Sequence, residues 1–194
     1  MLPEPPMLHL ASQSPRRRQL LQQLGVEFAV IDVEVVECRD AAESPLAYVQ
    51  RVARDKARAG LVSLGDGAVN AVVLGADTEV VLDGEVFGKP RDAQDAAAML
   101  ARLAGRTHEV ISALWLVANR RELAAVSVSQ VRFAALDAAA IAAYVDTGEP
   151  FGKAGGYAIQ GRGAALVEHL AGSYSGVMGL PLFETAQALR KFAD

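Results

Sequence analysis

Residues 71–90, AVVLGADTEVVLDGEVFGKP, constrain the fold more than any other stretch of the chain. They open with the apolar run AVVL, and a short continuous apolar run is typical of a strand buried on both faces. Asp83 and Gly84 stand between two further apolar runs and predict a hairpin, because both turn positions favour positive φ. We therefore expect Asp77 just past the carboxyl end of the first strand, where open α/β sheets place their ligand crevice. Lys89 follows the hairpin and leaves a cation near that strand end.

The size of the chain favours one domain. Its 194 residues suffice for a substantial core and are few for two domains. No internal repeat, low-complexity tract or linker-like stretch divides the sequence. We expect a single domain over residues 1–194, with residues 1–6 as a flexible N-terminus.

Composition and charge exclude several classes of protein. The formal net charge is -4 without any block of like charges, which argues against a nucleic-acid binder with a basic face. A small anionic substrate stays open, because local clusters of Arg and Lys can oppose the global sign. Cys38 is the only cysteine, so neither an intrachain disulfide nor a cysteine zinc site is expected. The sequence shows no signal peptide and no apolar run of transmembrane length, so we expect a cytoplasmic protein without a membrane partner.

Three arginines follow the first predicted strand, at residues 7–11. Ser14 caps the next helix, so that Arg16, Arg17 and Arg18 fall in its first turn, where basic residues oppose the helix dipole. Two interpretations remain open. Free backbone N–H groups together with arginine forks form a phosphate site, or the arginines form a solvated basic turn.

Lysine placement on the second predicted helix, over residues 45–64, poses a similar choice. Lys56 shares one broad face with Val49, Val52 and Ala53 at helical spacing. A lysine within an apolar stripe either extends to water or meets an anion. Strands are also predicted at 28–31, 108–117, 126–136 and 166–171, and helices at 92–103, after 137, and at 182–192.

Residues 148–164 hold six glycines, which permit positive φ and a close approach of the backbone to a ligand. Their spacing matches neither a P-loop nor GxGxxG. Alone, the segment predicts an ordered loop that is suited to a ligand. His108, at the start of a predicted strand, is interpreted as structural.

Five segments together resemble the Maf family of nucleotide pyrophosphatases: ASQSPRRRQLLQQLG, RVARDKA, LGADTEVVLDGEVFGKP, YVDTGEPFGKAGGYAIQGRGA and GSYSGVMGLPL. They occur in family order and spacing and cover residues 8–192. The resemblance implies an elongated single α/β domain with a central mixed sheet and a cleft, similar to the inosine-triphosphate pyrophosphatases. It implies hydrolysis of nucleoside triphosphates to the monophosphate and pyrophosphate with Mg²⁺ or Mn²⁺, in a homodimer.

The resemblance also implies roles for particular residues. Asp77 would be the general base, with a purely metal-holding role as the alternative, and Lys56 and Lys89 would complete the catalytic set. Glu37 would hold the metal together with Asp77, and Glu34 is its rival. The substrate-binding set would be Ser14, Arg16, Arg17, Thr78 and Gln160. Arg16, Thr78 and Gln160 place the chain with the branch that acts on dTTP and UTP, and clearance of modified pyrimidine nucleotides is a further expectation.

Glu79 departs from the family pattern, in which Ile or Val often follows the ADT sequence. Strand alternation points Glu79 away from Thr78, so it is either a surface residue or an added carboxylate near the metal. Two other functions remain open: a regulatory nucleotide-binding protein of septum and cell-shape control, and a pyrophosphatase with another base preference. The complete set of Asp77 and its cations favours catalysis, because a pure binder needs no anionic base at the cleavage site.

Overall fold

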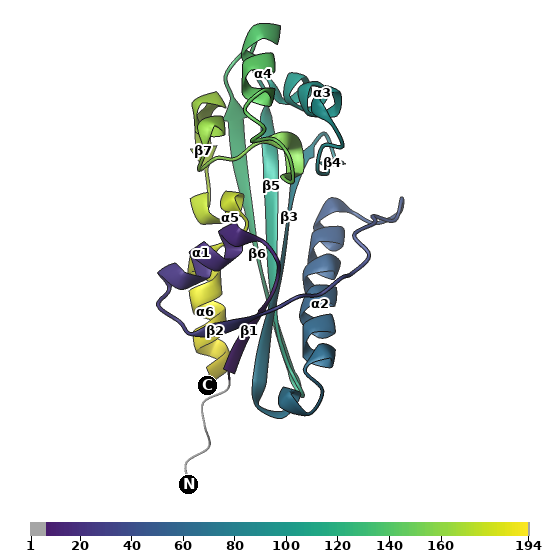
Figure 1. The fold of residues 1–194 in the computed structure, drawn as a ribbon, viewed down its shortest axis with the longest axis vertical. Coiled ribbons are helices and arrows are strands. Elements are labelled where there is room, and N and C mark those ends of the chain that lie inside the picture. The colour runs from purple at the N-terminus through teal and green to yellow at the C-terminus, as the bar shows by residue number, and fades with distance from the viewer. Residues whose placement is uncertain (1–6, 194) are drawn as a thin grey trace.

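The computed structural model describes residues 7–193. The predicted flexible N-terminus, residues 1–6, lies outside the described residues, as does Asp194. Figure 1 shows an elongated molecule whose long strands follow the long axis.

The described residues form one seven-stranded mixed sheet, which confirms the predicted α/β class. Its strands are β1 (Met7–Ala11), β2 (Phe28–Ile31), β3 (Ala71–Leu82), β4 (Glu85–Phe87), β5 (Thr107–Ala118), β6 (Arg121–Phe133) and β7 (Val167–Ala171). The order is β2-β1-β3-β5-β6-β7, and β4 also pairs with β3. β1 runs parallel to both of its neighbours, whereas the other pairs are antiparallel.

In the part of the chain that the structure describes, six α-helices surround the sheet: α1 (Pro15–Gln23), α2 (Pro45–Ser63), α3 (Ala93–Leu103), α4 (Ala138–Val145), α5 (Tyr174–Met178) and α6 (Leu182–Ala193). Each of α1 to α4 begins after a side-chain cap, from Ser14, Ser44, Asp92 and Asp137 respectively. The sequence did not predict α5, which has only five residues and contains a glycine. Within residues 7–193, no helix has both the length and the apolar character needed to cross a bilayer.

Helices cover both faces of the sheet (Figure 1). On β3, Val72, Leu74 and Ala76 pack in a core with α1 and α6, whereas Val81 packs in a core with α2. This period of two is the expected alternation of a strand. A third core lies under α3 and α4, at the end of the molecule away from the chain termini.

The placement of Asp77 at a strand end is wrong, because β3 runs without interruption through Asp77 to Leu82. Antiparallel β5 pairs with residues 73–81 along one edge. On the other edge, β1 pairs with residues 71–75 and β4 with residues 80–82. Residues 76–79 lie between these partners and form an open notch. The polar side chains end the apolar run but not the strand, because ladder hydrogen bonds join backbone groups.

Candidate active site

A cavity of about 640 Å³ lies at the notch. Its walls come from the β1–α1 loop, residues 33–37, α2, β3, the segment after β4, the glycine-rich segment and the end of α5. Every residue that the sequence nominated for the site lines this one cavity: Ser14, Arg16, Arg17, Glu34, Glu37, Lys56, Asp77, Thr78, Lys89 and Gln160. Segments that are far apart in the sequence therefore converge on this cavity.

On one face of β3, helix α2 comes unusually close to the strand. A Cβ on Gly75 would lie 2.2 Å from the carbonyl oxygen of Ala53, so only glycine allows this approach. The approach brings Lys56 Nζ to 2.8 Å from Asp77 Oδ1. Lys56 is 8% exposed, so it meets an anion and does not extend to water.

Glu37 joins the same group of charges. Its Oε1 lies 2.6 Å from Lys56 Nζ, and its Oε2 lies 3.5 Å from Lys89 Nζ. Burial alone would raise the pKa of Glu37, but the hydrogen bond and charge of Lys56, with those of Lys89, lower it overall. Within residues 7–193 Glu34 forms no ion pair, so Glu37 is the acidic residue of this loop that contacts the lysines.

Glu79 lies beside Asp77 on this face, and the expectation of a surface position is wrong. It is 9% exposed and lines the cavity, because alternation points it away from Thr78 but under α2. Burial, and then the charges of Asp77 and Glu37, raise the pKa of Glu79 to about 8. Within residues 7–193, Glu79 Oε2 and Asp77 Oδ2 are buried without a hydrogen-bond partner.

Arg17 and Thr78 hold the other face of the notch together. Arg17 donates from Nε to the carbonyl oxygen of Gly179 at 2.8 Å, from Nη1 to Ser12 Oγ at 3.3 Å and from Nη2 to Thr78 Oγ1 at 3.5 Å. Thr78 Oγ1 also lies 2.7 Å from Ser112 Oγ on β5. The arginine fork therefore ties α1 to β3 and to the end of α5. Burial lowers the pKa of Arg17.

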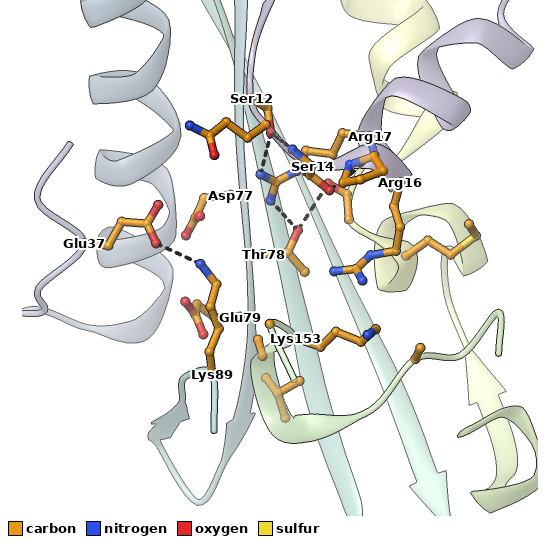
Figure 2. Close-up of a pocket in the computed structure, with 18 of the residues that line it drawn as sticks. Ser12, Ser14, Arg16, Arg17, Glu37, Asp77, Thr78, Glu79, Lys89 and Lys153 are labelled. Atoms are coloured by element: carbon orange, nitrogen blue, oxygen red, sulfur yellow. Dashed lines mark hydrogen bonds and ion pairs between the residues drawn. The ribbon is translucent and has the colours of Figure 1, made fainter. Parts of the chain in front are cut away.

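We call one side of the cavity the basic wall; it consists of Arg17 together with Arg16 and Lys153 (Figure 2). Burial and the charge of Arg17 lower the pKa of Arg16, and burial and the charge of Arg16 lower that of Lys153. Arg18 is exposed and donates to the carbonyl oxygen of Gln13 at 3.2 Å, outside the cavity. Of the two interpretations of the basic turn, the phosphate site suits Arg16 and Arg17, which line the cavity, and the solvated turn suits Arg18. Lys153 was not among the predicted site residues, although it lies in the glycine-rich segment that was predicted to suit a ligand.

Glu149 anchors the glycine-rich segment. It accepts hydrogen bonds from the Tyr144 hydroxyl at 2.7 Å and from the backbone N–H groups of Arg162 and Gly163, both at 2.9 Å. Gln160 lies within the anchored segment, at the exposed rim of the cavity. The glycines thus belong to a tightly folded loop. Glu149, which anchors this loop, was not predicted from the sequence.

His108 has the structural role expected for it. Its Nε2 lies 2.8 Å from the Tyr157 hydroxyl, and its ring contacts Phe133 edge-on. Burial lowers the pKa of His108 to about 4, so the ring is neutral near pH 7. Its contact with Tyr157 supports a side chain that lines the cavity, and His108 itself does not line it.

Comparison with known proteins places the chain in a family. The family model described as Maf-like protein matches residues 7–192. The chain belongs to the Maf-like family. It is 59% identical over 187 residues to the dTTP/UTP pyrophosphatase of Xanthomonas campestris pv. campestris, covering 96% of this chain and 98% of that protein. It is also 59% identical over 189 residues to the nucleoside triphosphate pyrophosphatase of Xylella fastidiosa (strain M23), covering 97% and 100%.

One solved structure shows a weaker likeness to this Maf-like chain. It is the crystal structure of the nucleoside-triphosphatase / dITP/XTP pyrophosphatase from Mycobacterium abscessus, with 18% identity and a TM-score of 0.41. The likeness covers 66% of this chain and 72% of the other. The α/β class of the chain is shown by its own mixed sheet and its helices.

The side chains of the Maf-like site suit a divalent cation. Within residues 7–193, no three His, Cys, Asp or Glu side chains are already gathered as a metal site. Mg²⁺ prefers oxygen ligands and usually takes one or two carboxylates together with water and substrate phosphates. The unpartnered buried oxygens of Asp77 and Glu79 are donors of this kind.

Proposed function

We propose that this chain hydrolyses nucleoside triphosphates, dTTP and UTP in particular, at the α–β phosphoanhydride to give the monophosphate and pyrophosphate. The observation that carries the proposal is the gathering of Arg16, Arg17, Lys56 and Lys89 around Asp77 in one cavity. The printed names of the two close relatives, dTTP/UTP pyrophosphatase and nucleoside triphosphate pyrophosphatase, support the substrate class.

The basic wall would bind the phosphates. Within residues 7–193, no carboxylate forms an ion pair with Arg16, Arg17 or Lys153. Their charge is therefore available to an anion, and arginine forks give directional hydrogen bonds to phosphate oxygens. Positive charge at the transferred group stabilises the charge that develops during cleavage.

Asp77 would act on the attacking water or hold the cation. Lys56 fixes the carboxylate through Oδ1, so that Oδ2 alone is free for a water or a metal ion. A bound Mg²⁺ or Mn²⁺ would supply Lewis-acid charge and an acidified water.

Gln160 would read the base. Its amide has a donor and an acceptor, which match the N3–H and the adjacent carbonyl of uracil or thymine. Glu149 holds the backbone that follows Gln160 in place through the N–H groups of Arg162 and Gly163. The homodimer, the cytoplasmic location and the clearance of modified pyrimidine nucleotides stay as predictions beside this proposal.

A panel of nucleoside triphosphates tests the proposal. With Mg²⁺ or Mn²⁺ present, we expect fast pyrophosphate release from dTTP and UTP and slow release from GTP. Release of orthophosphate without pyrophosphate would mean that another bond is cut, and nucleotide binding without turnover would favour the regulatory alternative.

A further inference from the structure

We propose that the divalent cation of this site is held by Asp77 and Glu79, and not by the pair Asp77 and Glu37 that the family resemblance implies. The inference deepens the proposed function and rests on it for the role of the cation. It makes Glu79 a metal ligand of this site.

The first argument is the state of the carboxylate oxygens. Both Glu37 oxygens already face lysines, Oε1 with Lys56 and Oε2 with Lys89. A cation bound there would have to displace them or lie against positive charge. Asp77 Oδ2 and Glu79 Oε2, in contrast, are buried without a partner among the described residues. A buried carboxylate oxygen without a partner is costly, so such an oxygen points to a ligand that is bound during function.

The second argument is position on the strand. Asp77 and Glu79 are two residues apart on β3, so their side chains leave the same face. Figure 2 shows both carboxylates on the Glu37 side of the strand, away from Arg16 and Lys153. Asp77 is 5% exposed and Glu79 is 9% exposed, and both line the cavity. A cation between them would face the substrate space across the notch.

The third argument is the balance of charge. This half of the cavity contains the acids Glu37, Asp77 and Glu79 against the cations Lys56 and Lys89. Once a bound cation has replaced the proton of Glu79, all three carboxylates are ionised and the two lysines leave one negative charge uncompensated. Among the described residues Glu79 is the one of these three acids without an ion pair, whereas Glu37 forms two and Asp77 forms one. A divalent cation would supply the missing positive charge and two bonds to oxygen.

Binding of Mn²⁺ to the full chain tests the inference. We would follow the loss of the free Mn²⁺ electron paramagnetic resonance signal, with and without the α,β-imido analogue of dTTP. The variants are Glu79→Gln and Glu37→Gln. The matched control is Glu109→Gln, which changes an exposed glutamate outside the cavity on the neighbouring strand β5.

Glu79→Gln should weaken Mn²⁺ binding roughly tenfold or more, as expected for a lost carboxylate ligand. Glu37→Gln should weaken it clearly less, and Glu109→Gln should leave it unchanged. Equal affinity of Glu79→Gln and the wild type, a larger loss in Glu37→Gln, or no Mn²⁺ binding by the wild type would each overturn the inference. If Glu79→Gln does not fold, Glu79→Val provides the same comparison.

Pyrophosphate release from dTTP by the wild type separates this inference from the proposed function. If the wild type releases pyrophosphate but Glu79→Gln binds Mn²⁺ as tightly as the wild type, the assignment of Glu79 as a metal ligand is refuted and the proposed function stands. Glu79-dependent Mn²⁺ binding without pyrophosphate release refutes the proposed function and leaves the cation site standing.

Discussion

The two faces of β3 at the notch differ in how their charges are compensated. Facing α2, Lys56 lies within 2.8 Å of both Glu37 and Asp77, so protein anions already neutralise its charge. Facing α1, the hydrogen bonds of the Arg17 guanidinium within residues 7–193 go to neutral oxygens, those of Ser12, Thr78 and Gly179. Figure 2 shows Glu37 and Asp77 on one side of the strand and Arg17 on the other.

This difference suggests a division of labour. Uncompensated positive charge attracts a polyanion, so the α1 face is the place for phosphates. On the α2 face the lysines orient the carboxylates, and the free carboxylate oxygens suit a water or a cation. One strand serves both because alternate residues point to opposite faces and no neighbouring strand closes the notch.

Asp77→Asn tests the α2 face and has the largest expected effect. The turnover number should fall between about 100-fold and 10,000-fold, the usual contribution of a general base, while the fold survives. Pyrophosphate release and the melting temperature measure the two outcomes. Asp83→Asn, at the exposed hairpin turn, is the control and should turn over normally. An active Asp77→Asn enzyme would refute both roles considered for this carboxylate.

Glu79→Gln tests the same face through stability at different pH. The pKa of Glu79 is raised from 4.5 to about 8, so the folded protein retains a proton that the unfolded chain releases between these values. The free energy of unfolding should therefore fall with rising pH, by up to about 1.4 kcal/mol per pH unit, and level off above pH 8. Glu79→Gln lacks this decrease in the free energy of unfolding. The stability of the variant relative to the wild type should therefore increase from pH 5 to pH 8.5.

Urea unfolding with a chelator present measures that difference. Glu109→Gln is again the control, and its difference from the wild type should not change across the same range. Parallel pH profiles of the wild type and Glu79→Gln would show that Glu79 does not hold the proton.

Gly75→Ala tests the contact that creates the Lys56–Asp77 pair. The new Cβ would lie 2.2 Å from a backbone oxygen and 2.5 Å from a backbone nitrogen of α2, so the helix must move. We expect a loss of about 1–3 kcal/mol in the free energy of unfolding and reduced turnover. Gly88→Ala has open space and should be close to neutral in stability. Normal activity in Gly75→Ala would mean that the Lys56 contact is dispensable.

Arg16→Ala tests the α1 face and has the smallest expected effect. Within residues 7–193 this guanidinium forms no ion pair, so its removal should raise the KM for dTTP roughly tenfold, about 1.4 kcal/mol, with little change in melting temperature. Arg18→Ala, on the solvent side of the same turn, should stay within about twofold of the wild type. Equal KM values for the two variants would remove Arg16 from the phosphate site.

Patterns within single segments predicted much of the fold. The cap Ser14 was predicted from the sequence because a cap acts on backbone groups three residues away. The Asp83-Gly84 turn adopts the predicted positive φ at both positions. The extent of β3 was not readable, because its polar centre is held by pairing with β5, about 35 residues further along the chain.

The sequence by itself nominated Asp77 and the cations around it and, through hydrophobic spacing, the helix face that carries Lys56. These features depend on residue type and on near neighbours in the chain. Only the tertiary structure decided that β1 and β4 leave a notch between them and that Glu79 is buried in it. It also decided that Lys56 and Lys89 form ion pairs with the two carboxylate oxygens of Glu37. The reason is that burial and ion pairing depend on which distant segments meet, and strand register and close helix packing set that outcome.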